Sequence, residues 1–413
     1  MRRNAIVLAA VAAALFLAFA GVAQASRTCD QMRSWLRQGG SASGLLVVEA
    51  ESGDVVCASA PGRTRPLASN MKLFTTATAL SRLGPETRIP TKVLRDGRID
   101  ENGVLHGSLY LKGGGDPALG TPSFYNAYLG GLGTNLFALK AQIRAAGIKS
   151  VTGRLYADDT VFDRRRGVAD SGYATSIYIG PLSGLAFNTG YAGSTSSSGF
   201  SSDPAKLAAA KLARSLRGAG VDLPAEVALR QAPPFAQQVA LVRSPTIHQI
   251  SNVTDVYSHN FFAEMLIKLL GARLGGAGTT AAGAEVVEDF ARSNNSIVNA
   301  VDGSGLTRSN RASPREVVDL LLGMREDPAG EEFIQDLALT GKEGTVAGRM
   351  RGTAAYGRCR TKTGTISGVS NLSGYCFNKS GRIMAFSILM SGVSSTTTAH
   401  VYQDRIAGLV AGY

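Results

Sequence analysis

A serine and a lysine stand three residues apart, at Ser69 and Lys72, where an apolar segment begins. In a helix, side chains at this spacing lie on one face, so the lysine amine can reach the serine hydroxyl. A serine hydroxyl is a weak nucleophile until a base removes its proton. A lysine can be that base when burial and a nearby positive charge lower its pKa from about 10.4 to roughly 7 to 8. The pair therefore indicates covalent catalysis by Ser69, with Lys72 as general base.

The alternative for this pair is a solvated helix surface, which is the more common setting for a serine and a lysine at this spacing. Ser-x-x-Lys occurs nowhere else in the chain, however, and the expected helix, which ends at Leu83 before Gly84, has little polar surface. Its apolar residues are Met71, Leu73, Phe74, Ala77, Ala79 and Leu80. Because a helix of this kind is normally buried, a lysine on it needs a partner or a function.

A Ser-x-Asn triplet occurs twice, at Ser258-His259-Asn260 and at Ser293-Asn294-Asn295. Either triplet could simply cap a helix or form a turn. We select Ser258 and Asn260 as site residues because a strongly apolar helix follows them directly and would hold them rigidly. The second triplet lies in a polar, turn-like stretch.

The triplet Lys362-Thr363-Gly364 occurs once, on an expected strand. Its lysine and hydroxyl suit a terminal carboxylate, and its glycine lets a substrate backbone approach closely. Lys362 could also supply the positive charge that lowers the pKa of Lys72. Taken alone, the triplet would be interpreted as exposed strand residues.

Hydrophobic spacing indicates the elements that hold these residues. Short apolar runs at 45–48 and 55–58 flank a polar turn and predict a hairpin. The other expected elements are strands at 358–366, 372–377 and 383–390, and helices at 136–146, at 203–220 and in an apolar segment ending at Gly271. Strands at both chain ends with helices between them predict an α+β domain that both ends form and an insert interrupts.

Together, the three motifs resemble those of the D-alanyl-D-alanine carboxypeptidases/endopeptidases of the penicillin-binding protein 4 type, peptidase family S13. The run from Ser258 continues to Ala263-Glu264, much like the family's Ser-x-Asn-x-x-Ala-Glu sequence. Other stretches similar to family signatures are Gly113-Gly114-Gly115-Asp116-Pro117, Asp302-Gly303-Ser304-Gly305-Leu306, Lys362-Thr363-Gly364-Thr365 and Gly368-Val369-Ser370. The resemblance covers nearly the whole chain after the first residues.

The resemblance implies a role for each residue of the first two motifs. Ser69 would be the acylated nucleophile and Lys72 its general base. Ser258 would relay a proton towards the leaving amine, and Asn260 would hydrogen-bond the substrate amide. The backbone N–H groups of Ser69 and Thr365 would form the oxyanion hole.

The resemblance also implies roles for the third motif. Lys362 would add positive charge, and Thr363 and Thr365 would bind the terminal carboxylate of the substrate beside Gly364. His259 departs from the family, in which an aspartate is common at this position. Since this middle residue has no assigned catalytic step, the implied mechanism stands, and its effect on the pH response is left open.

The implied fold class is α+β: the penicillin-binding/serine β-lactamase-like transpeptidase fold, an antiparallel sheet flanked by helices, with a smaller inserted α/β domain. We expect the catalytic domain at 26–90 and 235–413 and the insert at 91–234. Family members commonly nest a further domain in the insert, but here the corresponding stretch shrinks to the serine- and glycine-rich residues Gly193–Ser202. We therefore expect one inserted domain, whose turn at Gly113–Asp116 would border the active site.

Residues 1–25 have the features of a signal peptide. Arg2 and Arg3 precede an apolar run, Ala5–Val22, and the small-x-small cleavage site Ala23-Gln24-Ala25. An uncleaved anchor is the alternative, because the run approaches the length that spans a membrane. The alanine-rich run and the adjoining cleavage site favour removal, which would leave no transmembrane segment. We expect an exported protein of the periplasm or cell envelope.

The four cysteines are Cys29, Cys57, Cys359 and Cys376. In an oxidising compartment an even number favours disulfides, and four cysteines allow three pairings. Cys359 and Cys376 fall on consecutive expected strands, while Cys29 lies on an expected helix before the hairpin strand that carries Cys57. We therefore predict Cys29–Cys57 and Cys359–Cys376, against the alternative of four buried thiols.

The formal net charge is +12, but the basic residues are scattered. In an exported chain this favours anionic envelope polymers over nucleic acid, unless the charge is only a solvated surface. No metal-binding or cofactor motif occurs, so we expect no metal and no cofactor. The expected partners are β-lactam antibiotics and peptidoglycan stem peptides, with D-Ala-D-Ala termini or cross-links.

Two other functions are alternatives to a peptidase. A serine β-lactamase is also acylated, but the long segment between Ser69 and Ser258 argues against a compact β-lactamase. A catalytically idle wall-binding scaffold would be expected to carry a broken motif, and all three motifs are intact. The sequence leaves open the balance between trimming terminal D-alanine and cutting cross-links.

Overall fold

The computed structural model describes residues 26–413, which form two compact units. The first unit holds the residues up to Leu67, Ala312–Leu322 and Ala338–Tyr413, and the second holds Ala68–Arg311 and Gly323–Leu337. The signal peptide expected at 1–25 lies outside the described residues. Within the described part of the chain, no helix has the length and apolar character needed to cross a membrane.

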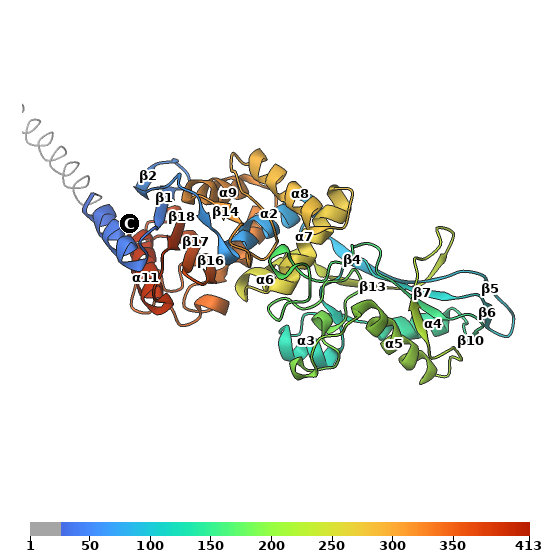
Figure 1. Ribbon diagram of the computed structural model, residues 1–413. Coiled ribbons are helices and arrows are strands. Elements are labelled where there is room, and N and C mark those ends of the chain that lie inside the picture. Colours follow the sequence, from blue (N-terminus) through green and yellow to red (C-terminus); the bar gives the residue numbers. More distant parts are fainter. Residues whose placement is uncertain (1–25) are drawn as a thin grey trace, which may run out of the picture. The chain divides into compact units, whose positions relative to one another are not determined.

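The first unit is built on an antiparallel sheet to which both chain ends contribute (Figure 1), with the strand order β15-β16-β17-β18-β1-β2. The strands are β1 (Gly44–Glu49), β2 (Val55–Ser59), β15 (Ala338–Leu339), β16 (Cys359–Ile366), β17 (Val369–Phe377) and β18 (Ile383–Ser391). A helix covers residues 26–39, and α11 (Thr396–Gly412) lies against β17 and β18. The predicted hairpin and the three predicted C-terminal strands are confirmed. Strands β1 and β18 are almost continuously buried, as expected for central strands covered on both faces.

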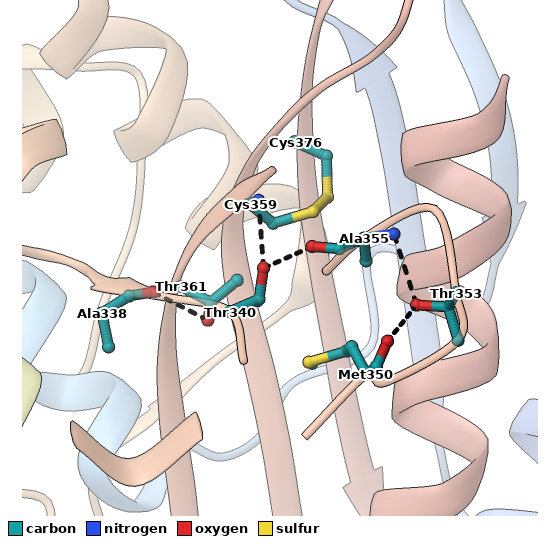
Figure 2. The surroundings of a disulfide bond; sticks show 8 residues. All are labelled: Ala338, Thr340, Met350, Thr353, Ala355, Cys359, Thr361 and Cys376. Carbon is teal, nitrogen blue, oxygen red and sulfur yellow. Dashed lines mark hydrogen bonds between the residues drawn. A yellow bond between two sulfur atoms is a disulfide. The ribbon is translucent and has the colours of Figure 1, made fainter. Parts of the chain in front are cut away.

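The two predicted disulfides are confirmed: Cys29 is bonded to Cys57 and Cys359 to Cys376. Cys359 and Cys376 are register partners on β16 and β17, with both side chains fully buried. Thr340 lies beside this bridge (Figure 2), where its hydroxyl accepts a hydrogen bond from the Cys359 N–H at 3.1 Å. The bridge therefore ties together the strand that carries the Lys362 motif and its neighbour.

Replacing both Cys359 and Cys376 with alanine should lower the free energy of unfolding by about 3 kcal/mol. The bridge closes a short loop in the unfolded chain, and loops of about 15 residues give stabilisation of this size. Urea denaturation of the double variant and the wild type, both without reductant, measures the difference. Equal urea midpoints would show that the bridge adds no stability.

The second unit begins with a 3-10 turn, Ala68–Asn70, and contains α2 and most of the remaining helices. Its helices are α2 (Met71–Leu83), α3 (Pro122–Tyr128), α4 (Ala138–Ala145), α5 (Pro204–Arg217), α6 (Ile247–Val256), α7 (Asn260–Leu274), α8 (Thr280–Ser293) and α10 (Gly330–Asp336). Helix α9 (Pro314–Glu326) has residues in both units. The predicted end of α2 is confirmed, since Gly84 follows Leu83 with a φ of 88° that favours glycine.

A mixed sheet organises the segment expected as the insert and also includes β13, which follows that segment. Its strand order is β12-β11-β7-β4-β13, in which β11 pairs in parallel with β7 and β12, and β4 pairs antiparallel with β7 and β13. The strands are β4 (Arg88–Arg95), β7 (Leu109–Lys112), β11 (Leu155–Asp158), β12 (Val227–Leu229) and β13 (Gln237–Thr246). Shorter strands are β5 (Arg98–Ile99), β6 (Val104–His106), β8 (Leu119–Gly120), β9 (Thr134–Asn135) and β10 (Ser150–Val151). Leu139 of α4 and Leu212 of α5 join strand residues such as Val93 and Leu155 in one buried cluster.

The predicted end of the apolar helix at Gly271 is wrong, because α7 continues to Leu274. Gly271 instead allows a close crossing with the next helix. A Cβ atom there would lie 2.7 Å from the Thr279 carbonyl oxygen, and one at Gly283 would lie 1.8 Å from the Ile267 carbonyl oxygen. The glycine that the sequence marks as a helix end thus allows α7 and α8 to pack closely.

Candidate active site

Ser69 lies in the short 3-10 turn that leads into α2. Its side chain is only partly buried, whereas its neighbours Ala68 and Asn70 are fully buried. Gly305 reaches this turn, and a Cβ atom at Gly305 would lie 1.8 Å from the Ala68 carbonyl oxygen. The turn therefore presents the Ser69 hydroxyl from a tightly packed backbone.

Lys72 is fully buried one turn after Ser69. Its ammonium nitrogen donates hydrogen bonds to Ser69 Oγ at 3.1 Å, to Asn260 Oδ1 at 2.8 Å and to the Ser304 carbonyl oxygen at 2.6 Å. A neutral amine has two N–H groups and one lone pair. When Asn260 Oδ1 and the Ser304 carbonyl oxygen accept hydrogen bonds from the two N–H groups of the neutral amine, its lone pair faces the Ser69 hydroxyl. This geometry is suited to taking a proton from Ser69.

The second motif lies between α6 and α7. Ser258 has a φ of 57°, in the left-handed region that few residues other than glycine adopt. The Asn260 amide nitrogen donates to the Tyr178 carbonyl oxygen at 3.0 Å, so Asn260 joins Lys72 to the loop that carries Tyr178. Within the described part of the chain, the Ser258 hydroxyl is not hydrogen-bonded to Ser69 or Lys72.

His259, the departure from the family pattern, caps α7. Its ring nitrogen Nδ1 accepts the hydrogen bond of the Phe262 N–H, and the two rings lie 4.5 Å apart. Burial, followed by the positive charge of Lys72, lowers the pKa of His259 to about 4. A neutral imidazole is the form whose Nδ1 can accept this bond. His259 thus fulfils the capping role that an aspartate commonly fulfils at helix starts.

Two buried acids, Glu264 and Asp302, lie behind Lys72, and the sequence indicates them only as parts of stretches similar to family signatures. Glu264 Oε1 accepts a hydrogen bond from the Ser304 N–H at 2.8 Å. The carbonyl oxygen of Ser304 in turn accepts a hydrogen bond from Lys72. Asp302 Oδ1 accepts a hydrogen bond from the Gly305 N–H at 2.7 Å and so fixes the turn between Asp302 and Gly305. Burial, and then the charge of Asp302, raises the pKa of Glu264 to about 8. A lone acid on an apolar helix, followed later by an Asp-Gly-Ser-Gly turn, is the sequence signal that could have indicated this network.

Glu264 predicts a pH dependence of stability. An exposed glutamate ionises near pH 4.3 in the unfolded chain, whereas folding keeps this one protonated. The stabilisation is therefore complete below pH 4.3 and is lost as the pH rises through about 8. Glu264→Gln keeps an acceptor for Ser304 but does not titrate. From pH 5 to 9 it should lose less stability than the wild type, by roughly 3 to 4 kcal/mol, because the linkage is about 1.4 kcal/mol per pH unit up to the folded pKa of about 8. Urea denaturation at several pH values measures this, and parallel stability curves would contradict it.

The third motif lies on β16 of the first unit. Lys362 is fully buried and donates to the Thr363 carbonyl oxygen at 3.0 Å. The Thr363 hydroxyl donates to Thr345 Oγ1 at 2.8 Å, Gly364 is buried, and Thr365 is exposed. The structure thus brings Ser69, Lys72 and Asn260 together in the second unit. It places the third motif on β16 of the first unit, where Lys362, Thr363 and Gly364 pair with β17 beyond the end of the short edge strand β15.

No group of three or more acidic, histidine or cysteine side chains within residues 26–413 could hold a metal ion. The chemistry that this arrangement offers is that of a serine activated by a buried amine.

Comparison with known proteins identifies the family and the fold of the chain. The family model described as the D-Ala-D-Ala carboxypeptidase 3 (S13) family matches residues 31–199 and 191–413. The D-alanyl-D-alanine carboxypeptidase of Actinomadura sp. is 32% identical over 91% of this chain and 82% of its own length. The crystal structure of penicillin binding protein 4 from Haemophilus influenzae has a TM-score of 0.77 at 20% identity, covering 93% of this chain and 99% of that one. A peptidoglycan endopeptidase from Bdellovibrio bacteriovorus has a TM-score of 0.56 at 19% identity, covering 88% and 90%. The chain belongs to the D-Ala-D-Ala carboxypeptidase 3 (S13) family of serine peptidases, with its α+β penicillin-binding fold.

Proposed function

We propose that the chain removes the terminal D-alanine of peptidoglycan stem peptides through an acyl-enzyme on Ser69, and that penicillins acylate the same serine. The observation that carries this proposal is the fully buried Lys72, whose amine bonds to both Ser69 and Asn260. The Actinomadura relative, named a D-alanyl-D-alanine carboxypeptidase, supports the substrate class. The Haemophilus protein has also been solved in complex with a β-lactam, which supports the second part.

In this mechanism Lys72 takes the proton of Ser69 as its oxygen attacks the carbonyl of the penultimate D-alanine. The tetrahedral intermediate collapses, the peptide C–N bond breaks, and the leaving amine receives a proton through Ser258. Water then attacks the ester on Ser69 and releases the shortened peptide. Asn260 orients the substrate amide. One hydrogen of its side-chain amide is donated to the Tyr178 carbonyl oxygen, and the other is available to the substrate.

We assign the third motif the roles that the family resemblance gives it. Lys362 supplies positive charge, Thr363 and Thr365 bind the terminal carboxylate of the substrate, and Gly364 leaves room for its backbone. The N–H groups of Ser69 and Thr365 are the oxyanion donors of this proposal.

We further propose that residues 1–25 are removed on export and that the enzyme works in the periplasm or cell envelope, without a nucleic acid partner. The domains are proposed as 26–90 with 235–413 for catalysis and 91–234 for one insert. The single buried cluster that links Val93, Leu139, Leu155 and Leu212 supports one insert rather than two.

Mass spectrometry of digested muropeptides tests the activity. Purified protein should shorten a pentapeptide ending in D-Ala-D-Ala by one D-alanine. Incubation with cross-linked muropeptides measures any endopeptidase activity. Rapid hydrolysis of penicillin with no peptide product would instead identify a β-lactamase, and neither labelling nor product would identify an idle scaffold.

A further inference from the structure

Two hollows lie side by side in the second unit, at the end of α7 that is remote from the second motif. Their volumes are about 380 Å³ and 410 Å³, and both are lined by Pro90 and Arg273, so they adjoin. The walls come from the end of α2, from β4, from β7 with the residues after it, from β13 and from the last turn of α7. Figure 1 shows β4 and β13 next to each other in this region. We call the two hollows together the basic groove.

The lining of the basic groove includes six cationic side chains and no carboxylate. These are Arg82, Arg88, Lys92, Lys112, Arg243 and Arg273. Lys112 has a carboxylate near it, Asp158 Oδ2 at 4.0 Å. Within residues 26–413, neither an ion pair nor a side-chain hydrogen bond engages Lys92, Arg243 or Arg273. This part of the scattered positive charge is therefore concentrated and largely uncompensated.

The groove is separate from the proposed catalytic residues of the second unit. Asn260 begins α7 and Arg273 lies in its last turn. Thirteen helical steps separate them, or about 20 Å at 1.5 Å per residue. A ligand in the groove should therefore leave the Ser69 and Lys72 site accessible.

We propose that the basic groove binds a phosphodiester-linked polyol polymer of the cell envelope. Guanidinium groups hydrogen-bond phosphate oxygens in pairs, and four of the six cations are arginines. The half-buried apolar side chains of Pro90, Leu94 and Val161 share the lining with these cations. A polymer of alternating phosphates and C–H-rich polyols matches this lining. The shared wall at Pro90 and Arg273 suits an extended chain better than one small anion.

The groove variant replaces Lys92, Arg243 and Arg273 with glutamate, and a second version replaces them with glutamine in case the reversed charges disturb folding. The matched control replaces Arg144, Lys206 and Arg214 with glutamate. These three side chains are exposed on α4 and α5, and the control changes the net charge by the same amount as the groove variant. The probe is fluorescent poly(glycerol phosphate), and its anisotropy is measured at several salt concentrations.

The wild type should bind the probe, and the groove variant should bind at least about tenfold more weakly at low salt. The slope of its plot of log affinity against log salt concentration should be smaller in magnitude by about two, since three cations are lost. The control should bind within about twofold of the wild type. All variants should be acylated by penicillin at the wild-type rate, which separates this proposal from the proposed peptidase activity.

Failure of the wild type to bind the probe would overturn the proposal. Equal losses of affinity in the groove variant and the control would also overturn it and would indicate diffuse surface charge. Displacement of the probe by inorganic phosphate at matched phosphate concentration would instead indicate a small-anion site, and equally tight binding of polygalacturonate would indicate a site for carboxylate polymers.

Discussion

Ser69→Ala should abolish covalent labelling by a fluorescent penicillin and stop the release of D-alanine from a pentapeptide. The variant lacks the oxygen that forms the ester bond, which lies 3.1 Å from the buried Lys72 amine. Labelling is measured on a denaturing gel over hours, so that slow residual acylation would also be seen. The fold should persist, because Ser69 is only partly buried and its hydroxyl bonds to Lys72 alone among the described residues.

Ser293→Ala is the matched control, because Ser293 belongs to the other Ser-x-Asn triplet. Its hydroxyl bonds to the Phe290 carbonyl oxygen at 2.7 Å, near the end of α8. This variant should label at the wild-type rate. If Ser69→Ala still formed a covalent adduct at that rate, the nucleophile would be a different residue.

Much of the fold could be predicted because local rules determine it. The alternation of short apolar runs and turns indicated the strands of the first unit, and their order along the chain placed Cys359 opposite Cys376. The apolar residues of α2 and the glycine after Leu83 indicated its length. Gly271 misled the prediction because glycine serves two purposes, ending helices and allowing helices to cross closely, and only the position of Thr279 and Ile267 shows which applies.

The candidate site could be predicted as a set of residues but not as a network. Ser69 and Lys72 are neighbours by helical geometry, whereas the Lys72 acceptors Asn260 and Ser304 follow it by 188 and 232 residues. Contacts across such separations depend on tertiary packing. The same limit applies to Glu264, whose bond to the Ser304 N–H spans 40 residues. It also applies to Tyr178, whose carbonyl reaches Asn260 from the expected insert.

The capping by His259 shows how a departure from a family pattern can be explained by geometry. An imidazole nitrogen and a carboxylate oxygen can both accept the hydrogen bond of a backbone N–H at a helix start. A histidine in place of an aspartate removes a negative charge close to Lys72. The positive charge of Lys72 in turn helps to lower the pKa of His259. The helix start is therefore kept while the charge around the amine changes.

Lys72→Arg should slow acylation of Ser69 by about 10²- to 10⁴-fold, the usual contribution of a positioned general base. Arginine keeps a positive charge and several donors for Asn260 Oδ1 and the Ser304 carbonyl oxygen. It cannot give up a proton at any ordinary pH, so it cannot accept the Ser69 proton. The substitution therefore separates the function of a base from that of a fixed charge.

Lys72→Gln is the companion variant, since it removes the charge but retains N–H donors for the two buried acceptors. Both variants should lose acylation if Lys72 is the base, whereas a purely electrostatic or structural lysine would leave the arginine variant close to wild type. The acylation rate constant is obtained from labelling time courses at several penicillin concentrations. Urea denaturation checks the fold, because the side chain at this position is fully buried. A folded Lys72→Arg protein with a rate constant within about tenfold of the wild type would exclude Lys72 as the general base.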